Sequence, residues 1–179
     1  MGTRLLRYLL CVSLVLWLGA ITTTTFFVAP SLFGNESGET PNSTIAANVI
    51  APLLHKMELT GWILIPVMLI LLGVLWTRSK RASPKVFVST GVMLALAWGL
   101  GLYSGIPVTN EMHEIRIELK ERYGGYHLAP DNHPDRARFR GLHAAASSIT
   151  MVNLLLGLGA LFCVTQLIGR EESSGSNPG

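Results

Sequence analysis

Histidine and glutamate side chains give this sequence its clearest potential for chemistry. His55, His113 and His143 lie in or beside segments that we expect on one side of a membrane. Imidazole and carboxylate ligands together suit zinc or copper(II). No two of these histidines have a tight ligand spacing such as His-x3-His, so they are candidate ligands without a defined metal site, and we expect no bound cofactor. The glutamates near them along the chain are Glu58, Glu111 and Glu114.

His143 also belongs to a polar stripe on the last apolar segment. Its members are spaced by four, three, four and three residues, which keeps side chains on one face of a helix: Arg136, Arg140, His143, Ser147 and Thr150. Because lipid offers such groups no hydrogen-bond partner, we expect the stripe to point into a helix bundle. His143 is then a metal, haem or proton site, or it hydrogen-bonds to the first helix or the region of His55 and fixes the packing. We favour the packing role.

The composition indicates an integral membrane protein. Apolar residues make up 49% of the 179 residues and charged residues only 14%, and the mean hydropathy is +0.42. An ordinary soluble domain carries about 25% charged residues, so this chain has too little charge to face water on all sides. The same numbers exclude a disordered chain, which would be poor in apolar residues and rich in charge.

Four apolar stretches are long enough to cross a membrane, because a hydrocarbon core about 30 Å thick takes about 20 helical residues. None of them carries Asp, Glu, Lys or Arg in its middle. We therefore predict an all-α integral membrane protein, with a single domain of four transmembrane helices and a flexible tail at residues 171–179. The predicted spans are residues 8–33, 59–77, 86–106 and 141–168.

Basic residues near the ends of the spans predict the orientation, because short cytoplasmic loops are rich in Lys and Arg. Arg4 and Arg7 precede the first span, and the link at residues 78–85 is short, basic and free of acids. We therefore expect both termini to be cytoplasmic, in an inner or plasma membrane. The formal net charge of +3 is then a topology signal, and it implies no nucleic-acid partner.

The outer side is expected to carry one further helix. Apolar residues recur at helical spacing between residues 108 and 123, with charged residues between them. We expect an amphipathic helix over the mouth of the bundle or on the lipid surface, ended by Gly124. The other outer loop, residues 34–43, contains formal glycosylation acceptors at Asn35 and Asn42. The apolar stripe of the expected helix is Val108, Met112, Ile115 and Leu119.

Prolines, glycines and cysteines give further local expectations. Pro52 predicts a kink or break before the second span, and Pro134 suits the first turn of the helix that continues as the fourth span. We expect Cys11 and Cys163 to be reduced and buried. Glycines of the third and fourth spans are expected to allow close helix approach: Gly99, Gly101, Gly105, Gly157 and Gly159.

The sequence contains no enzyme signature among those sought: no Gly-rich phosphate loop, His-Glu-x-x-His or Gly-x-Ser-x-Gly. The spans also lack the buried Asp, Glu or Lys that marks many ion-coupled pumps. We expect a structural or accessory subunit without catalytic activity of its own, in contact with the lipid bilayer and with other membrane protein subunits. The alternative is a metal-ion handling protein or a small-solute transporter. Its route would be lined by Thr22, His55, His143 and Ser147.

Several motifs, taken in order, resemble the transmembrane protein 205-like family, also catalogued as domain of unknown function 4149. The resemblance covers residues 5–168 and implies a four-helix membrane protein, but no catalytic residue. This sequence departs from the family at residues 51–54, where Ala-Pro-Leu-Leu replaces a more aromatic Phe-Pro-x-Tyr-like segment. The matching motifs are Trp17-Leu18-Gly19, Pro107-Val108-Thr109-Asn110-Glu111-Met112 and Arg138-Phe139-Arg140-Gly141-Leu142-His143. The family block comprises Phe139, His143, Ser147 and Asn153.

Overall fold

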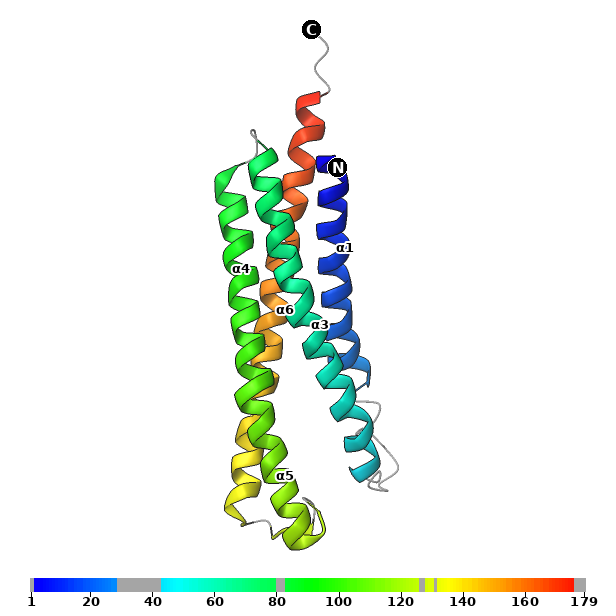
Figure 1. Cartoon of the computed structure of the whole chain (residues 1–179), viewed down its shortest axis with the longest axis vertical. Helices are drawn as coiled ribbons and strands as arrows, with labels where there is room; N and C mark the ends of the chain where they lie inside the picture. The colour runs from blue at the N-terminus through cyan, green and yellow to red at the C-terminus, as the bar shows by residue number, and fades with distance from the viewer. Residues whose placement is uncertain (1, 29–42, 80–82, 126–127, 131, 176–179) are drawn as a thin grey trace.

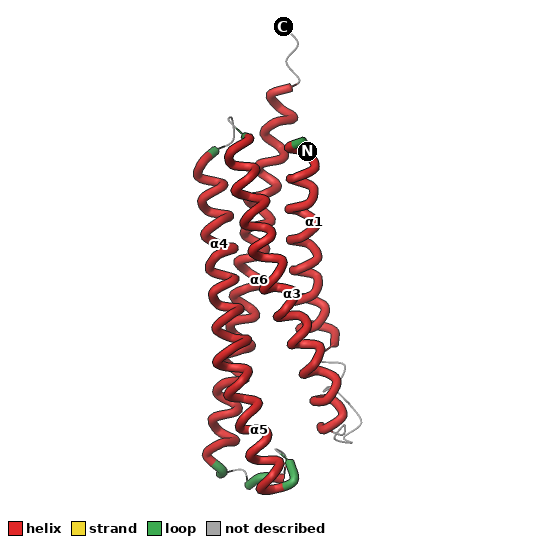
Figure 2. The backbone as a smooth tube through the Cα atoms, viewed as in Figure 1, coloured by secondary structure: helices red, strands yellow, loops and turns green. Residues whose placement is uncertain are grey.

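The computed structural model describes residues 2–28, 43–79, 83–125, 128–130 and 132–175, and over these residues the regular elements are all helices (Figure 2). Residues 34–42 of the predicted loop, with the acceptors Asn35 and Asn42, lie outside the described residues. The elements in chain order are α1 (Thr3–Thr22), η1 (Thr23–Val28), α3 (Ser43–Arg78), α4 (Pro84–Tyr103), η2 (Ser104–Val108), α5 (Thr109–Tyr123) and α6 (Pro134–Gly175).

Four of the helical segments are long and apolar enough to cross a membrane, which confirms the predicted number of spans. Each begins before the predicted span, because the helices continue beyond the most apolar residues. The four segments are Thr3–Val28, Pro52–Arg78, Pro84–Tyr123 and Pro134–Gln166.

The four long helices form a bundle in which each packs against two neighbours. The main contacts join α1 to α3, α3 to α4, α4 to α6 and α6 back to α1 (Figure 1). The core lies between them and is almost entirely aliphatic. Its fully buried members include Leu10, Leu14, Met68, Leu75, Leu94 and Val164.

Trp17 lies at the centre of the bundle, where glycines from two other helices make room for its ring. Only 3% of its surface is exposed. A Cβ atom added at Gly61 of α3 would lie 3.1 Å from the Trp17 Nε1 atom. One added at Gly157 of α6 would lie 2.7 Å from Trp17 Cζ3 and 2.5 Å from Leu18 Cδ2. Glycine therefore sets the distance between α1 and its two neighbours.

Of the other four predicted packing glycines, two are in tight contact, Gly101 has a neighbour at ordinary contact distance, and Gly99 has none. Gly105 and Gly159 are in tight contact, because added Cβ atoms would lie 2.5 Å from Trp62 Cζ2 and 3.1 Å from Met93 Sδ. Gly99 has no such neighbour within 4 Å, so the prediction of close approach is wrong at that position.

The α5 helix continues directly from α4 through η2, and the three elements form one long rod (Figure 1). A helix thus covers the expected residues, but it extends α4 lengthwise, and the expected amphipathic helix over the mouth of the bundle or on the lipid surface is not confirmed. Ile115 and Leu119 are buried, and they pack with Ala129 against Phe139 and Leu142 of α6. The α5 helix extends α4 lengthwise because these contacts hold it alongside α6.

The ends of the helices follow the local sequence signals in most places. Gly124 ends α5 in a left-handed conformation, with φ of 82°, and its N–H donates to the Lys120 carbonyl. The α6 helix begins at Pro134, as predicted, but it continues to Gly175, so residues 171–175 are helical where we expected a flexible tail. The α3 helix runs through Pro52 without a break.

Candidate functional site

The N-terminal half of α6, which we expected on the outer side, carries most of the residues that the sequence singles out, and it does not present them as predicted. Arg140, His143 and Ser147 are exposed. We expected this stripe to point into the bundle and His143 to bond to α1 or to the region of His55, and the exposure contradicts the inward orientation. The residues that turn inward instead are Leu142, Ala146, Ile149 and Asn153, spaced by four, three and four.

Hydroxyl groups along this half of α6 bond to their own helix. Ser147 Oγ donates to the His143 carbonyl at 2.9 Å, and Ser148 Oγ to the Ala144 carbonyl at 2.9 Å. Such back-bonding satisfies a hydroxyl locally, so Ser147 needs no partner on a neighbouring helix of this chain.

Phe139 and His143 lie one turn apart with parallel rings. Their centroids are 6.4 Å apart and the planes differ by 3°. The Arg116 guanidinium of α5 lies over the Phe139 ring, 5.6 Å from its centroid. Nearby, Arg138 Nε donates to Glu111 Oε1 at 2.6 Å, which joins α6 to the first turn of α5. These contacts make the Phe139 end of the family block a junction between two helices.

Asn153, the remaining member of the family block, is buried, with 9% of its surface exposed. It faces α4, where a Cβ atom added at Gly101 would lie 3.9 Å from Asn153 Nδ2. Its Oδ1 atom is covered and has no hydrogen-bond partner among the described residues. A buried amide oxygen without a partner is unfavourable. The packing of the aliphatic core therefore gives no reason for an asparagine at position 153.

The three candidate metal ligands are all exposed. His55 lies on α3, His113 on α5 and His143 on α6. Over the described part of the chain, no group of three or more His, Cys, Asp or Glu side chains is placed to hold a metal ion. Within the described residues, these histidines and the nearby glutamates therefore form no group of three or more that could hold a metal ion.

Glu58 occupies a position that the sequence prediction missed. The α3 segment long and apolar enough to span begins at Pro52, so Glu58 lies within it, whereas we placed the start of the span at Leu59. The carboxyl is half-buried, and its Oε1 atom accepts a hydrogen bond from Thr109 Oγ1 at 3.4 Å. We expected no buried Asp, Glu or Lys in the spans, and Glu58 departs from this expectation as a half-buried carboxyl in the α3 segment.

The second carboxylate oxygen of Glu58 is held against the α4–η2 segment. Its Oε2 atom is covered and has no hydrogen-bond partner within the described residues, and the same is true of Trp62 Nε1 one turn further along α3. Both side chains meet Gly105, where an added Cβ would lie 3.2 Å from Glu58 Oε2 and 2.5 Å from Trp62 Cζ2. A carboxylate at a helix–helix contact in a span is costly, and such groups usually have a role.

The backbone opposite Glu58 is a π-helical turn, η2, with Pro107 inside it. Proline has no N–H to donate and its ring crowds the preceding turn, so a wider turn is a natural response. The Thr109 N–H donates to the Ser104 carbonyl, and Thr109 Oγ1 reaches the same carbonyl at 3.0 Å. This turn places Thr109 within reach of Glu58. Glu58 and Trp62 are four residues apart, which places them on the same face of a helix, and this spacing is the sequence signal that could have linked these two side chains.

The remaining predicted residues are dispersed. Thr22 is half-buried and Thr24 is buried, at the junction of α1 and η1. Cys11 and Cys163 are free and half-buried rather than buried, and Cys163 Sγ lies 3.6 Å from Ser89 Oγ. Arg7, which we used only as a topology signal, is buried and donates to Ser79 Oγ at 3.1 Å, joining α1 to the end of α3.

Comparison with known proteins finds no matching family model, no matching curated protein and no matching solved structure. The resemblance to the transmembrane protein 205-like family therefore stays a prediction from the motifs of the sequence.

Proposed function

We propose that this chain is a structural or accessory subunit of a larger membrane complex, without catalytic activity of its own. The observation that carries the proposal is the exposed outer half of α6. It presents the imidazole of His143 from within a segment that is long and apolar enough to span a membrane. Polar groups in a span seldom face lipid, so a helix of a partner subunit is a suitable cover for this face.

Small residues on the same face support the proposal. Gly141, Ala144, Ala145 and Ser148 are exposed and recur at spacings of three, one and three. This spacing produces two overlapping small-xxx-small pairs, which let the backbones of membrane helices approach closely. A neighbouring helix packed here would contact the backbone of α6 and give the imidazole of His143 a hydrogen-bond partner.

The test is co-purification of the full chain from its native membrane in a mild detergent, followed by mass measurement of the intact complex. We expect the wild-type chain to be recovered with a partner subunit. Ala145→Leu should lose this partner, because the larger side chain keeps the helices apart. Ala95→Leu is the matched control, since Ala95 is also exposed in a span but lies on α4, and it should keep the partner. A wild-type monomer, or retention of the partner by Ala145→Leu, would contradict the proposal.

The alternative function, metal-ion handling or small-solute transport, has one observation in its favour, the carboxyl of Glu58 within the α3 span. A carboxylate in a span can mark the route of a cation or proton. Elemental analysis of the purified protein tests it. A stoichiometric metal that is lost in Glu58→Gln supports transport or metal handling, whereas a metal-free wild-type protein leaves the accessory role as the better proposal.

For the location we propose a multi-pass protein of an inner or plasma membrane with both termini cytoplasmic. The support is the distribution of basic residues, with Arg4 and Arg7 at the start of α1 and Arg78 and Lys85 around the link between α3 and α4. The membership of the transmembrane protein 205-like family is likewise a proposal, and it rests on the motifs alone.

A further inference from the structure

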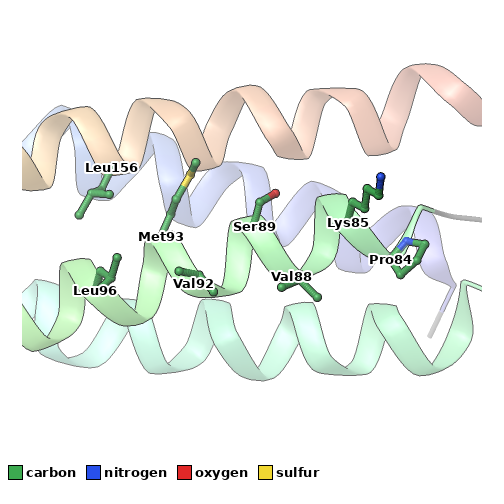
Figure 3. Close-up of a pocket in the computed structure, with 8 residues that line it drawn as sticks. All are labelled: Pro84, Lys85, Val88, Ser89, Val92, Met93, Leu96 and Leu156. Atoms are coloured by element: carbon green, nitrogen blue, oxygen red, sulfur yellow. The ribbon is translucent and has the colours of Figure 1, made fainter.

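An open groove of about 680 Å³ runs along α4 on its side toward α6. Figure 3 shows its lining, which is apolar along the helix and carries one ammonium group, that of Lys85, near the end where α4 begins. The principal lining residues are Lys85, Val88, Val92, Met93 and Leu96 of α4 and Leu156 of α6.

The residues of the groove form a continuous stripe on one helix face. Lys85, Val88, Val92 and Leu96 are spaced by three, four and four residues, and the three apolar ones are 51%, 52% and 54% exposed. Eleven residues of helix separate Lys85 from Leu96, which corresponds to a rise of about 16 Å. One leaflet of a hydrocarbon core about 30 Å thick is about 15 Å deep. The groove from Lys85 to Leu96 is therefore about as long as one acyl layer is thick.

The end of the groove at Lys85 is suited to an anion. Lys85 has no ion-pair partner among the described residues, and the N-cap residue Ser83 makes no side-chain hydrogen bond to the first turn of α4. Pro84 has no N–H, and the Val86 N–H donates to the Ser83 carbonyl at 3.1 Å, so the attraction for phosphate comes from the charge of Lys85 and the positive partial charge of the helix N-terminus. Ser89 adds little, because its hydroxyl already donates to the Val86 carbonyl at 3.1 Å.

We propose that this groove binds an anionic phospholipid, with the phosphate headgroup at Lys85 and the start of α4 and one acyl chain along Val88, Val92 and Leu96. The charge selects the headgroup and the groove holds the chain. The lipid belongs to the leaflet on the side of the link between α3 and α4. In the proposed orientation this is the cytoplasmic leaflet, whose surface is negative in cells.

Native mass spectrometry of the full-length protein tests the proposal, with phosphatidylglycerol and phosphatidylcholine of identical acyl chains as the two probes. We expect tighter binding of phosphatidylglycerol by the wild-type protein. Lys85→Gln should weaken that binding about fivefold, which corresponds to about 1 kcal/mol for one cation at an anionic surface. Arg4→Gln removes an equal charge from an exposed site on α1 at the same end of the bundle and should have no such effect.

A second variant tests the apolar part of the groove. Val92→Phe places a larger ring in it and should weaken binding of both phospholipids, while its exposed position leaves the core unchanged. Equal affinity of the wild-type protein for the two lipids, or equal effects of Lys85→Gln and Arg4→Gln, would overturn the choice of an anionic headgroup. Unchanged binding by Val92→Phe would overturn the assignment of the acyl chain to this groove.

The occupant is checked with a photo-crosslinking amino acid at position 88 in the native membrane. An adduct of phospholipid mass supports the proposal, and an adduct of protein mass would refute it and assign the groove to a helix of a partner. These outcomes do not depend on whether the outer half of α6 binds a partner subunit, because the two faces carry separate variants and separate readouts.

Discussion

Replacing Gly157 by alanine should destabilise the bundle through one methyl group at the contact between α6 and α1. The added Cβ would lie 2.5 Å from Leu18 Cδ2 and 2.7 Å from Trp17 Cζ3. Carbon atoms in favourable contact are about 3.5–4.0 Å apart, so the two helices or the side chains must shift by about 1 Å. Leu18 and Trp17 are 6% and 3% exposed, which leaves them little free space.

The expected loss of stability in Gly157→Ala follows from two opposing effects, overpacking of the core and helix propensity. Forcing an extra methyl group into a packed core costs about 1–3 kcal/mol, and glycine to alanine in a helix gains about 1 kcal/mol. Gly99→Ala is the matched control, because nothing lies within 4 Å of a Cβ added there. The propensity gain is common to both variants, so Gly157→Ala should be less stable than Gly99→Ala by about 1–3 kcal/mol.

Reversible unfolding in mixed micelles of mild detergent and dodecyl sulfate, followed by circular dichroism, measures the free energy of unfolding of both variants. Equal free energies for Gly157→Ala and Gly99→Ala would refute the reasoning, since they would mean that α1 and α6 do not approach closely at Trp17. A difference that disappears when Leu18 is also replaced by alanine would identify Leu18 as the residue that clashes.

Three further predictions concern other parts of the chain. A cysteine at Ser83 should react with a membrane-impermeant thiol reagent from the cytoplasmic side and one at Gly125 from the outer side, and labelling of both from the same side would contradict the topology. Arg138→Ala should lower the free energy of unfolding by at most about 1 kcal/mol, because its 2.6 Å ion pair with Glu111 is solvent-exposed; a larger loss would show that the pair holds α5 to α6. Glu58→Gln should unfold at the same or a higher temperature than the wild-type protein, since Oε2 has no described hydrogen bond to lose and the neutral amide is less costly to bury; a marked drop in that temperature would show that the negative charge itself stabilises the contact.

The sequence was sufficient to predict four helices long and apolar enough to cross a membrane and where several helices end. The four spans depend on the length and hydropathy of continuous segments, and these are properties of the chain alone. Gly124 and Pro134 gave the end of α5 and the beginning of α6 because a left-handed cap and a proline at the first helical position are local backbone requirements.

The orientation of α6 was decided only by the tertiary structure. Helical spacing shows that Arg140, His143 and Ser147 share a face, but it does not say which face meets the neighbours. That face is selected by the packing of Asn153 and Gly157 against α4 and α1, and by the contacts of Leu142 with α5. The inward-facing stripe therefore lies one position before the polar stripe along α6.

The environment of Glu58 and the groove at Lys85 also depend on contacts between distant segments. Glu58 is 51 residues from Thr109, its hydrogen-bond donor, and the two meet because α3 packs against α4 and the π-helical turn at Pro107 directs Thr109 toward α3. Leu156 of α6 reaches the α4 groove only because α4 and α6 are neighbours in the bundle. Sequence periodicity determines which side chains share a helix face, whereas burial and pairing depend on which faces the whole set of helices brings together.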